Sequence, residues 1–503
     1  MTEKKRDELI TQIKDNESDF IKFIYERLGI VIKTHQTHEL HKTILNAYHK
    51  FNEEPKEYLD KLRDCQDHSP LLEHLISGVT VGETYFFRDK HQINLLKDKI
   101  LIDIIQRKRE ENNLSLRIWS AGSATGEEIY TITMLLHELI PDIDKWRLSL
   151  LATDINMESL KKGVAGLYGE WSMRSIQDYF KRRYFTQFNK EYSFSQQLKE
   201  LVHFDYLNLN EDTYPDIFNA TNAQDLILCR NVFIYFDADK ITHIMKKLNA
   251  CLMPGGYLLL GASDPVNITG TDFIFHHHDG LVFTRPQTND QPIKIIKTIA
   301  TEKMEPVPPV CEKIDKKVIA KPEPISNHLD QDKITEMLQS TNWQEIINMI
   351  DQTILNDSNA SFLLSIKATA LANLGKLSEA ERICQSSLAL HSTNKDMYFT
   401  YALILIELNQ LTEAEKLLRK TLFLDHQFVP AHFQLGLLLL RNKQHEVGLK
   451  SLRNALVIAK SKDTQEEVAG SHGLRYGQLV IMLKHEIEIH TSSGNINYVD
   501  QNA

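Results

Sequence analysis

The sequence predicts an α/β domain with a doubly wound parallel sheet, placed between a small all-helical region and a C-terminal helical repeat region. Three observations predict this arrangement. Apolar residues keep helical spacing up to about residue 78, short apolar runs alternate with helical stretches over 79–286, and a motif recurs every 34 residues further on. A chain of 503 residues is also too long for one hydrophobic core, so several domains are expected.

The composition indicates a folded protein of a reducing compartment. Hydrophobic residues make up 42% of the chain and charged residues 25%, and the net charge of -10 argues against non-specific nucleic-acid binding as its main function. The five cysteines are scattered without a C-x-x-C pair, which predicts no structural zinc. The N-terminus lacks the apolar core of a signal peptide, and no run approaches the roughly 18 apolar residues that cross a bilayer. We therefore expect a cytoplasmic protein without membrane insertion.

The first two regions differ in their hydrophobic pattern. Within residues 1–78, the stretch from Phe20 to Ile32 places apolar residues at helical spacing, which predicts an all-helical domain. Over 79–286, five short apolar runs are typical of buried strands, and a helical stretch follows the first of them. These strands are expected at 116–120, 148–154, 201–206, 225–230 and 255–264, with the helix at 127–139. The alternation favours a doubly wound sheet, and 273–285 reads as a hairpin that closes its edge.

Residues 287–328 are rich in Pro, Lys and Glu and predict an extended linker. The repeats follow, over 329–490. Similar hexapeptides begin at Gly375, Asn409 and Lys443, 34 residues apart, and small residues keep the same period shortly before each one. Such a period, with small residues where helices cross, is the signature of tetratricopeptide (TPR) repeats. A helical bundle with chance similarity is the alternative.

Candidate ligand-binding residues follow the predicted strands, because ligands of doubly wound sheets bind at the carboxyl ends of the strands. After the first strand, the loop "AGSATGEE" carries Gly122, where the backbone can approach a ligand. This loop is neither G-x-G-x-x-G nor a P-loop. Asp154 ends the second strand, where an acid can bind a ribose diol; a helix N-cap is its alternative role. With Asn208, Arg230 and Asn231 at other strand ends, these residues favour a nucleoside-sized cofactor.

Four sequence blocks resemble the signature blocks of the CheR family. They are "TYFFRD" (84–89), "WSAGSATGEEIY" (119–130), "ATDI" (152–155) and "CRNVFIYFD" (229–237). Members of this family are S-adenosylmethionine-dependent methyltransferases that esterify glutamates of chemotaxis receptors. The blocks occur in family order, and the resemblance covers about residues 10–285.

The resemblance implies roles for the residues that match the cofactor site. Thr84 and Arg88 would reach the methionine end of the cofactor. Glu128 and Asp154 would bind its amino group or ribose, beside the backbone at Gly122.

The resemblance also places residues at the adenine and at the transferring methyl group. Asn208 and Leu209 would flank the adenine, and Arg230 and Asn231 would complete the pocket. Tyr235 would lie near the methyl group. Arg182 matches a functional arginine of the family, so that Arg88, Arg182, Arg230 and Tyr235 form the implied catalytic set. Whether Arg230 holds the cofactor, the incoming carboxylate or both stays open.

Some positions depart from the family pattern. Gly82 replaces the usual Asn, which puts one cofactor contact in doubt, and Ser123, Ala124 and Ile129 replace the usual Cys, Ser and Pro. No ionisable position is lost, so we expect an active enzyme. The acceptor chemistry is undemanding, because a glutamate side chain with a pKa of about 4.3 is already ionised at neutral pH and needs no general base. Proximity alone can contribute on the order of 7–11 kcal/mol.

No metal is expected. The run from His276 to His278 would alternate between the faces of a strand, so its three imidazoles cannot converge on one ion.

The leading hypothesis is a methyltransferase for the cytoplasmic domain of chemoreceptors, whose TPR tail binds a protein or peptide or controls access to the active site. Two alternatives remain: a methyltransferase with another protein or a small molecule as acceptor, and a TPR adaptor with a cofactor-binding but inactive front domain.

Overall fold

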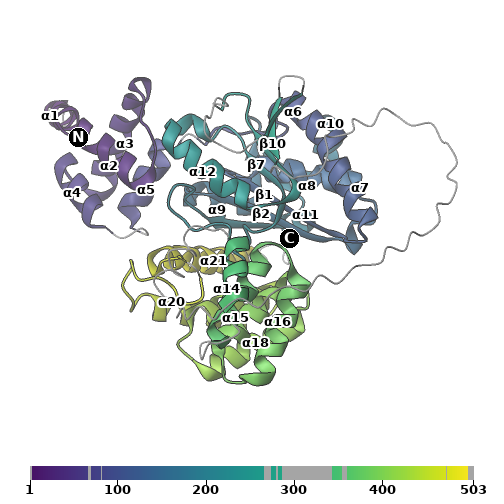
Figure 1. Ribbon diagram of the computed structural model, residues 1–503. Helices are drawn as coiled ribbons and strands as arrows, with labels where there is room; N and C mark the ends of the chain where they lie inside the picture. The colour runs from purple at the N-terminus through teal and green to yellow at the C-terminus, as the bar shows by residue number, and fades with distance from the viewer. Residues whose placement is uncertain are drawn as a thin grey trace.

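The computed structural model describes residues 3–65, 69–80, 82–264, 274–278, 281–285, 343–353, 360–471 and 473–496. Figure 1 shows three parts: N-terminal helices in purple, a central sheet covered by helices, and a C-terminal helical array in green and yellow. The predicted linker 287–328 lies outside the described residues. So do the side chains of His276 to His278.

The N-terminal helices pack around their own apolar core. Their bounds are α1 (Glu3–Asp15), α2 (Glu17–Leu28), η1 (Thr34–Gln36), α3 (Thr37–Phe51), α4 (Pro55–Asp64) and α5 (Pro70–Val79). Phe20, Ile24 and Leu75 are fully buried in this core, as the helical spacing of the apolar residues predicts. Helix α2 ends at Gly29, whose φ of 75° supplies the left-handed C-cap.

The central sheet has the strand order β6-β2-β1-β7-β8-β10-β9. Its strands are β1 (Ser115–Ala121), β2 (Arg147–Asp154), β6 (Val202–Tyr206), β7 (Gln224–Cys229), β8 (Leu252–Leu260), β9 (Ile274–His278) and β10 (Leu281–Arg285). The first five strands in this order are parallel, and β10 and β9 form an antiparallel hairpin at the edge. The predicted doubly wound sheet and its closing hairpin are therefore confirmed. The strand order reverses between β1 and β7, which is where such a sheet binds its ligand.

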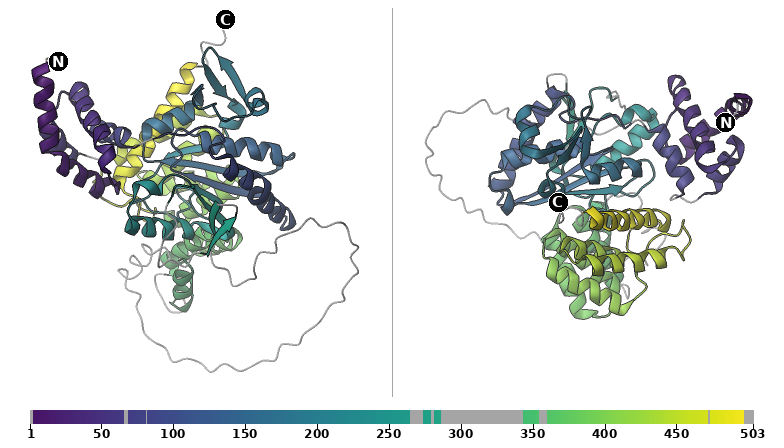
Figure 2. Two further views of the ribbon diagram at one scale, coloured as in Figure 1. Left: turned by 90° about the horizontal axis from the view of Figure 1, so that it is seen from above. Right: turned by 180° about the vertical axis from the view of Figure 1, so that it is seen from behind.

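Helices cover both faces of the sheet (Figures 1 and 2). They are α6 (Lys90–Leu95), η2 (Leu96–Leu101), α7 (Ile102–Glu110), α8 (Glu127–Leu139), η3 (Ile143–Lys145), α9 (Met157–Ala165), α10 (Asp178–Tyr184), α11 (Gln196–Lys199), η4 (Phe233–Tyr235) and α12 (Ala238–Ala250). Successive strand residues point to opposite faces, so Ile118 joins the core beneath α8 while Trp119 joins the core beneath α12. Both residues are fully buried.

A second, small antiparallel sheet lies in the segment between α9 and β6, where the sequence pattern predicted no clear element. Its order is β3-β5-β4, with β3 (Leu167–Gly169), β4 (Phe185–Phe188) and β5 (Glu191–Phe194). Phe194 packs on Tyr130 of α8 with a centroid distance of 4.4 Å, which anchors this sheet to the main domain.

The C-terminal helices form antiparallel pairs with the predicted 34-residue period. They are α14 (Trp343–Thr353), α15 (Ala360–Asn373), α16 (Leu377–Leu390), α17 (Lys395–Glu407), α18 (Leu411–Leu424), α19 (Val429–Arg441), α20 (His445–Ala459) and α21 (Tyr476–Ile496). The turns at Gly375, Asn409 and Lys443 all have positive φ, of 76°, 59° and 61°. A Cβ at Gly436 would lie 2.5 Å from Leu452, so a small residue is required where α19 crosses α20.

Candidate active site

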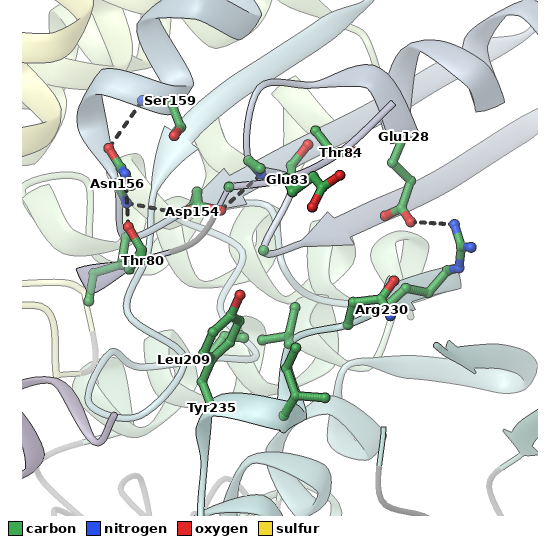
Figure 3. Close-up of a pocket in the computed structure, with 18 of the residues that line it drawn as sticks. Thr80, Glu83, Thr84, Glu128, Asp154, Asn156, Ser159, Leu209, Arg230 and Tyr235 are labelled. Carbon is green, nitrogen blue, oxygen red and sulfur yellow. Dashed lines mark hydrogen bonds and ion pairs between the residues drawn. The ribbon is translucent and has the colours of Figure 1, made fainter. Parts of the chain in front are cut away.

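A cavity of about 300 Å³ opens at the carboxyl ends of β1, β2, β6 and β7 (Figure 3). Its walls come from the loop after β1, the ends of β2 and β6, the turn after β7, and the segment after α5. Leu28 and Ile30 of the N-terminal domain also line it. The volume is within the range of small-molecule binding sites.

The glycine loop after β1 lies against the end of β2. Gly122 has a φ of 76°, and a Cβ there would lie 2.5 Å from Val232, so only glycine fits. The backbone N–H groups of Gly122 and Ser123 both donate to the Thr153 carbonyl, at 2.8 and 2.9 Å. The loop therefore presents its backbone to the cavity at a fixed distance from Asp154.

Asp154 is held by backbone N–H groups. Its carboxylate accepts from Ala124 at 2.9 Å and from Asn156 at 2.8 Å. Burial raises the pKa of the Asp154 carboxyl, and these hydrogen bonds oppose the shift. Each oxygen keeps a lone pair for a ligand hydroxyl. The predicted N-cap role belongs instead to Asn156, whose side chain accepts from the Ser159 N–H at 3.1 Å.

Arg230 and Glu128 form a buried ion pair at 2.9 Å. The other guanidinium nitrogens of Arg230 donate to the Gln92 side chain at 2.5 Å and to the Arg88 carbonyl at 2.9 Å. Glu128 also accepts from the Ser120 hydroxyl at 2.7 Å. Arg230 thus ties the end of β7 to α6, α8 and the segment that carries Arg88, and its charge is neutralised within the protein.

The turn after β7 is organised by Asp264, a residue that the sequence analysis did not single out. Its carboxylate accepts backbone N–H groups from Asn231 at 2.7 Å, Phe233 at 3.0 Å and Gly261 at 2.8 Å. These bonds stabilise Asn231 in the left-handed region, at a φ of 60°. The available signal was the position of Asp264, an acid at the end of the strand predicted at 255–264.

Tyr235 points its hydroxyl into the cavity from η4 (Figure 3). Burial raises the pKa of the Tyr235 phenol, so it stays protonated at neutral pH. Its carbonyl accepts the Val31 N–H at 2.8 Å, and its side chain packs on the N-terminal core. The N-terminal domain is therefore joined to the cavity wall at the residue expected beside the methyl group.

The structure brings almost all predicted site residues to this one cavity. Those that line it are Thr84, Arg88, Gly122, Glu128, Asp154, Asn208, Leu209, Arg230, Asn231 and Tyr235. Arg182 is the exception, because α10 turns Phe180 and Tyr184 inward and leaves Arg182 exposed, outside the set of lining residues. The structure does not bring Arg182 to the cavity, and its catalytic role stays a prediction.

Other lining residues were missed because they lie between the recognisable blocks. Thr80 is one of them: its hydroxyl donates to the Ile76 carbonyl at 2.7 Å and accepts from the Asn156 side chain at 2.9 Å. Gly82, already named for its departure from the family pattern, lines the cavity as well, and a Cβ there would lie no closer than 3.5 Å to another heavy atom.

The lining fits a cofactor that has a nucleoside and an amino-acid end. It offers carboxylates for hydroxyl or ammonium groups, amides beside apolar Leu209, and a backbone cradle at Gly122. Among the described residues, no group of three His, Cys, Asp or Glu side chains could hold a metal ion. Within the same residues, no helix is both long and apolar enough to cross a bilayer.

Comparison with known proteins identifies two families. A family model described as CheR methyltransferase, SAM binding domain matches residues 82–279, and a tetratricopeptide repeat model matches 371–435. The chemotaxis protein methyltransferase of Borreliella burgdorferi is 32% identical over 260 residues, which cover 50% of this chain and 89% of the relative. Chemotaxis protein methyltransferase 1 of Vibrio cholerae serotype O1 is 31% identical over 51% of this chain and 91% of the relative. Among solved structures, MamA of Desulfovibrio magneticus RS-1 is 17% identical over 27% of this chain and 78% of its own, with a TM-score of 0.24.

Proposed function

This chain belongs to the CheR family of S-adenosylmethionine-dependent methyltransferases, and we propose that it esterifies glutamate side chains in the cytoplasmic domains of chemoreceptors. One observation carries the proposal. A single cavity combines Asp154, the Arg230–Glu128 pair and Tyr235, and it is bordered by Leu28 and Ile30 of a separate helical domain. A macromolecular acceptor can therefore be contacted outside the cavity while one side chain enters it.

S-adenosylmethionine supplies an electrophilic methyl group on a sulfonium. In our proposal Asp154 accepts hydrogen bonds from the ribose hydroxyls, and Asn208 and Leu209 flank the adenine. Glu128 interacts with the amino group of the methionine end, and Arg230 positions Glu128 rather than contacting the acceptor, because its guanidinium already contacts Glu128, Gln92 and the Arg88 carbonyl.

Arg88 is the better candidate to orient the incoming carboxylate. Its guanidinium donates to the Glu83 carbonyl at 2.6 Å, and it has no carboxylate partner within the described residues. An arginine with remaining N–H donors at the cavity wall can align a carboxylate by charge-assisted hydrogen bonds. The neutral Tyr235 hydroxyl would complete this alignment as a donor. No base is required, because the acceptor glutamate is already ionised.

The test uses the full chain, labelled S-adenosylmethionine and a soluble receptor cytoplasmic fragment. The expected result is base-labile methyl label on glutamates of the fragment, located by mass spectrometry. We expect Arg88→Ala to raise the KM for the fragment about tenfold or more while S-adenosylhomocysteine binding changes little. Arg174→Ala serves as the matched control, because Arg174 already stacks between Tyr85 and Trp171 at 3.6 and 4.0 Å.

The outcomes separate the alternatives. Label on another protein or on a small molecule would contradict receptor glutamates as the acceptor. Cofactor binding with no transfer to any acceptor would favour the adaptor hypothesis. An equal effect of both arginine substitutions would contradict the role of Arg88. We further propose that the TPR region serves partner binding or regulation of this methyl transfer.

A further inference from the structure

The TPR array contacts its own methyltransferase domain through the loop 212–223, which follows β6. Ile217 and Phe218 of this loop are each only 5% exposed, because they belong to the hydrophobic core of the repeats. Phe218 lies beside Phe399 of α17 and Phe433 of α19, at centroid distances of 6.4 and 5.7 Å. Phe399 and Phe433 are one 34-residue period apart, so successive repeats present the same position to one side chain.

Polar side chains of the repeats bind the backbone of the same loop. Asn373 accepts the Ile217 N–H at 2.8 Å, and Gln434 donates to the Phe218 carbonyl at 3.1 Å. Glu407, one period after Asn373, forms a largely buried ion pair with Arg117 of β1. The loop is therefore held by apolar contacts and by sequence-independent backbone contacts, in the way that a repeat surface holds a bound peptide.

Helix α21 extends this interface to the sheet. Figures 1 and 2 show α21, in yellow, on the side of the array that faces the sheet. Ile481 belongs to the core of the methyltransferase domain, and Glu488 pairs with Lys161 of α9 at 3.0 Å. Gln478 donates from its side-chain amide to Asp212, and both residues are buried, at 8% and 6% exposure.

Asp212 connects this interface to the cofactor cavity. One oxygen of its carboxylate accepts from Gln478, and the other accepts the backbone N–H of Asn208. Asn208 and Leu209 line the cavity, and the Tyr214 hydroxyl donates to the Leu209 carbonyl at 2.6 Å. A short chain of hydrogen bonds thus runs from the TPR domain, through Asp212, to the cavity wall.

We infer that Gln478 of the TPR domain is a positioning residue for the cofactor site, so that docking of the repeats and binding of the adenosine end of the cofactor are coupled. The inference rests on the proposed function insofar as Asn208 and Leu209 flank the adenine. With Gln478 bound, Asp212 is restrained at both carboxylate oxygens, and the Asn208–Leu209 wall is ordered before the cofactor arrives. By linkage, the cofactor strengthens docking by the same factor.

The experiment measures binding of S-adenosylhomocysteine and of 5′-methylthioadenosine to the full chain by calorimetry. Gln478→Leu removes the donor to Asp212 at similar volume. We expect both ligands to bind about 5- to 30-fold more weakly, by the same factor, because only the adenosine end is affected. In turnover with saturating acceptor, KM for S-adenosylmethionine should rise by a similar factor while kcat stays within twofold. Hydrogen exchange at the Asn208 amide should become faster.

Gln385→Leu is the matched control, since Gln385 is exposed on α16, and all of these quantities should keep their wild-type values. If Gln478→Leu does not fold, Asn373→Ala is the second variant, because it removes the hydrogen bond between Asn373 and the Ile217 N–H of the same loop. We expect this variant to show a smaller loss of affinity for both ligands. Binding within twofold of the wild type in a folded Gln478→Leu or Asn373→Ala chain overturns the inference. Absence of binding by the wild-type chain would instead overturn the proposed cofactor site, and the inference with it.

Discussion

The cavity at the strand ends and the face of the repeats that contacts the loop 212–223 are two surfaces of one chain, and they differ in what fills them. The cavity keeps about 300 Å³ open between apolar side chains and a few polar groups that are held by buried hydrogen bonds, and its arginine, Arg230, is neutralised by Glu128. On the repeats, Phe218 is buried between Phe399 and Phe433 and leaves little of its surface exposed. The first surface is organised for a ligand, whereas the second already has an occupant from the same chain.

This difference has an energetic consequence. The cavity is kept open by buried hydrogen bonds and an ion pair, which hold their geometry only while every partner is present. The face of the repeats that contacts the loop is held mainly by apolar burial, which tolerates changes that preserve volume. Polar substitutions should therefore be costly at the cavity, and loss of volume should be costly at the repeats.

The largest effect is expected for Arg230→Ala. The change leaves Glu128 buried without its partner and frees the Arg88 segment, so we expect a loss of about 3–5 kcal/mol in the free energy of unfolding. The fall in kcat/KM should be at least about 100-fold, and urea denaturation and label transfer measure the two quantities. Arg109→Ala removes an exposed pair with Asp142 and should change neither. Wild-type stability of Arg230→Ala would contradict the view that this pair organises the cavity.

Phe218→Ala addresses the repeats and should have the next largest effect. Removal of a buried ring from between Phe399 and Phe433 should lower the free energy of unfolding by about 3–4 kcal/mol. Phe423→Ala is the control, because the Phe423 side chain is 79% exposed, and it should change stability by less than about 0.5 kcal/mol. Equal effects of the two substitutions, measured by chemical denaturation, would show that the loop is not docked on the repeats.

A third prediction concerns the pH dependence of stability, which we expect from Asp216 in the docked loop. Burial raises the pKa of the Asp216 carboxyl to about 7, although its side chain accepts the Phe218 N–H at 3.0 Å. Between pH 3.8 and about 7 the unfolded chain has lost the Asp216 proton, whereas the folded chain retains it. The stability that comes from keeping this carboxyl protonated is therefore complete below pH 3.8 and is lost as the pH rises through that window. Asp216→Asn should therefore stabilise the chain more at pH 8 than at pH 5, with a difference of about 2–3 kcal/mol in the free energy of unfolding. Asp463→Asn, an exposed control, should leave the difference between the two pH values unchanged.

The smallest effect is expected for Gly82→Asn, which restores the residue usual in the family. A Cβ at Gly82 would lie 3.5 Å from the Ser159 hydroxyl and 3.8 Å from the Ala124 side chain, so the cavity has room for it. We expect about two- to fivefold tighter binding of S-adenosylhomocysteine, measured by calorimetry, from one added hydrogen bond. Gly122→Asn is the contrasting variant and should abolish binding, because a Cβ there meets Val232 at 2.5 Å. Weaker binding by Gly82→Asn would show that the open space is itself required.

The arrangement of the elements could be predicted from the sequence because it depends on local periodicity. Alternation of apolar strands and helices predicts the parallel sheet, and a 34-residue period predicts the repeats down to the turns at Gly375, Asn409 and Lys443. The cavity residues could be predicted because polar groups at the ends of parallel strands meet at one edge. Asp264 and Gln92 could not, since their roles are hydrogen bonds to residues distant in the chain.

The sequence by itself determined the fold class and the family, and it predicted many of the residues that line the cavity. Only the tertiary structure decided that Arg230 is occupied by Glu128, that Arg182 lies away from the cavity lining, and that the repeats bind the loop 212–223. The physical reason is range. The patterns that predict strands and helices depend on neighbouring residues. The contact from Gln478 to Asp212 instead joins positions 266 residues apart, and it forms only when both domains have folded and docked.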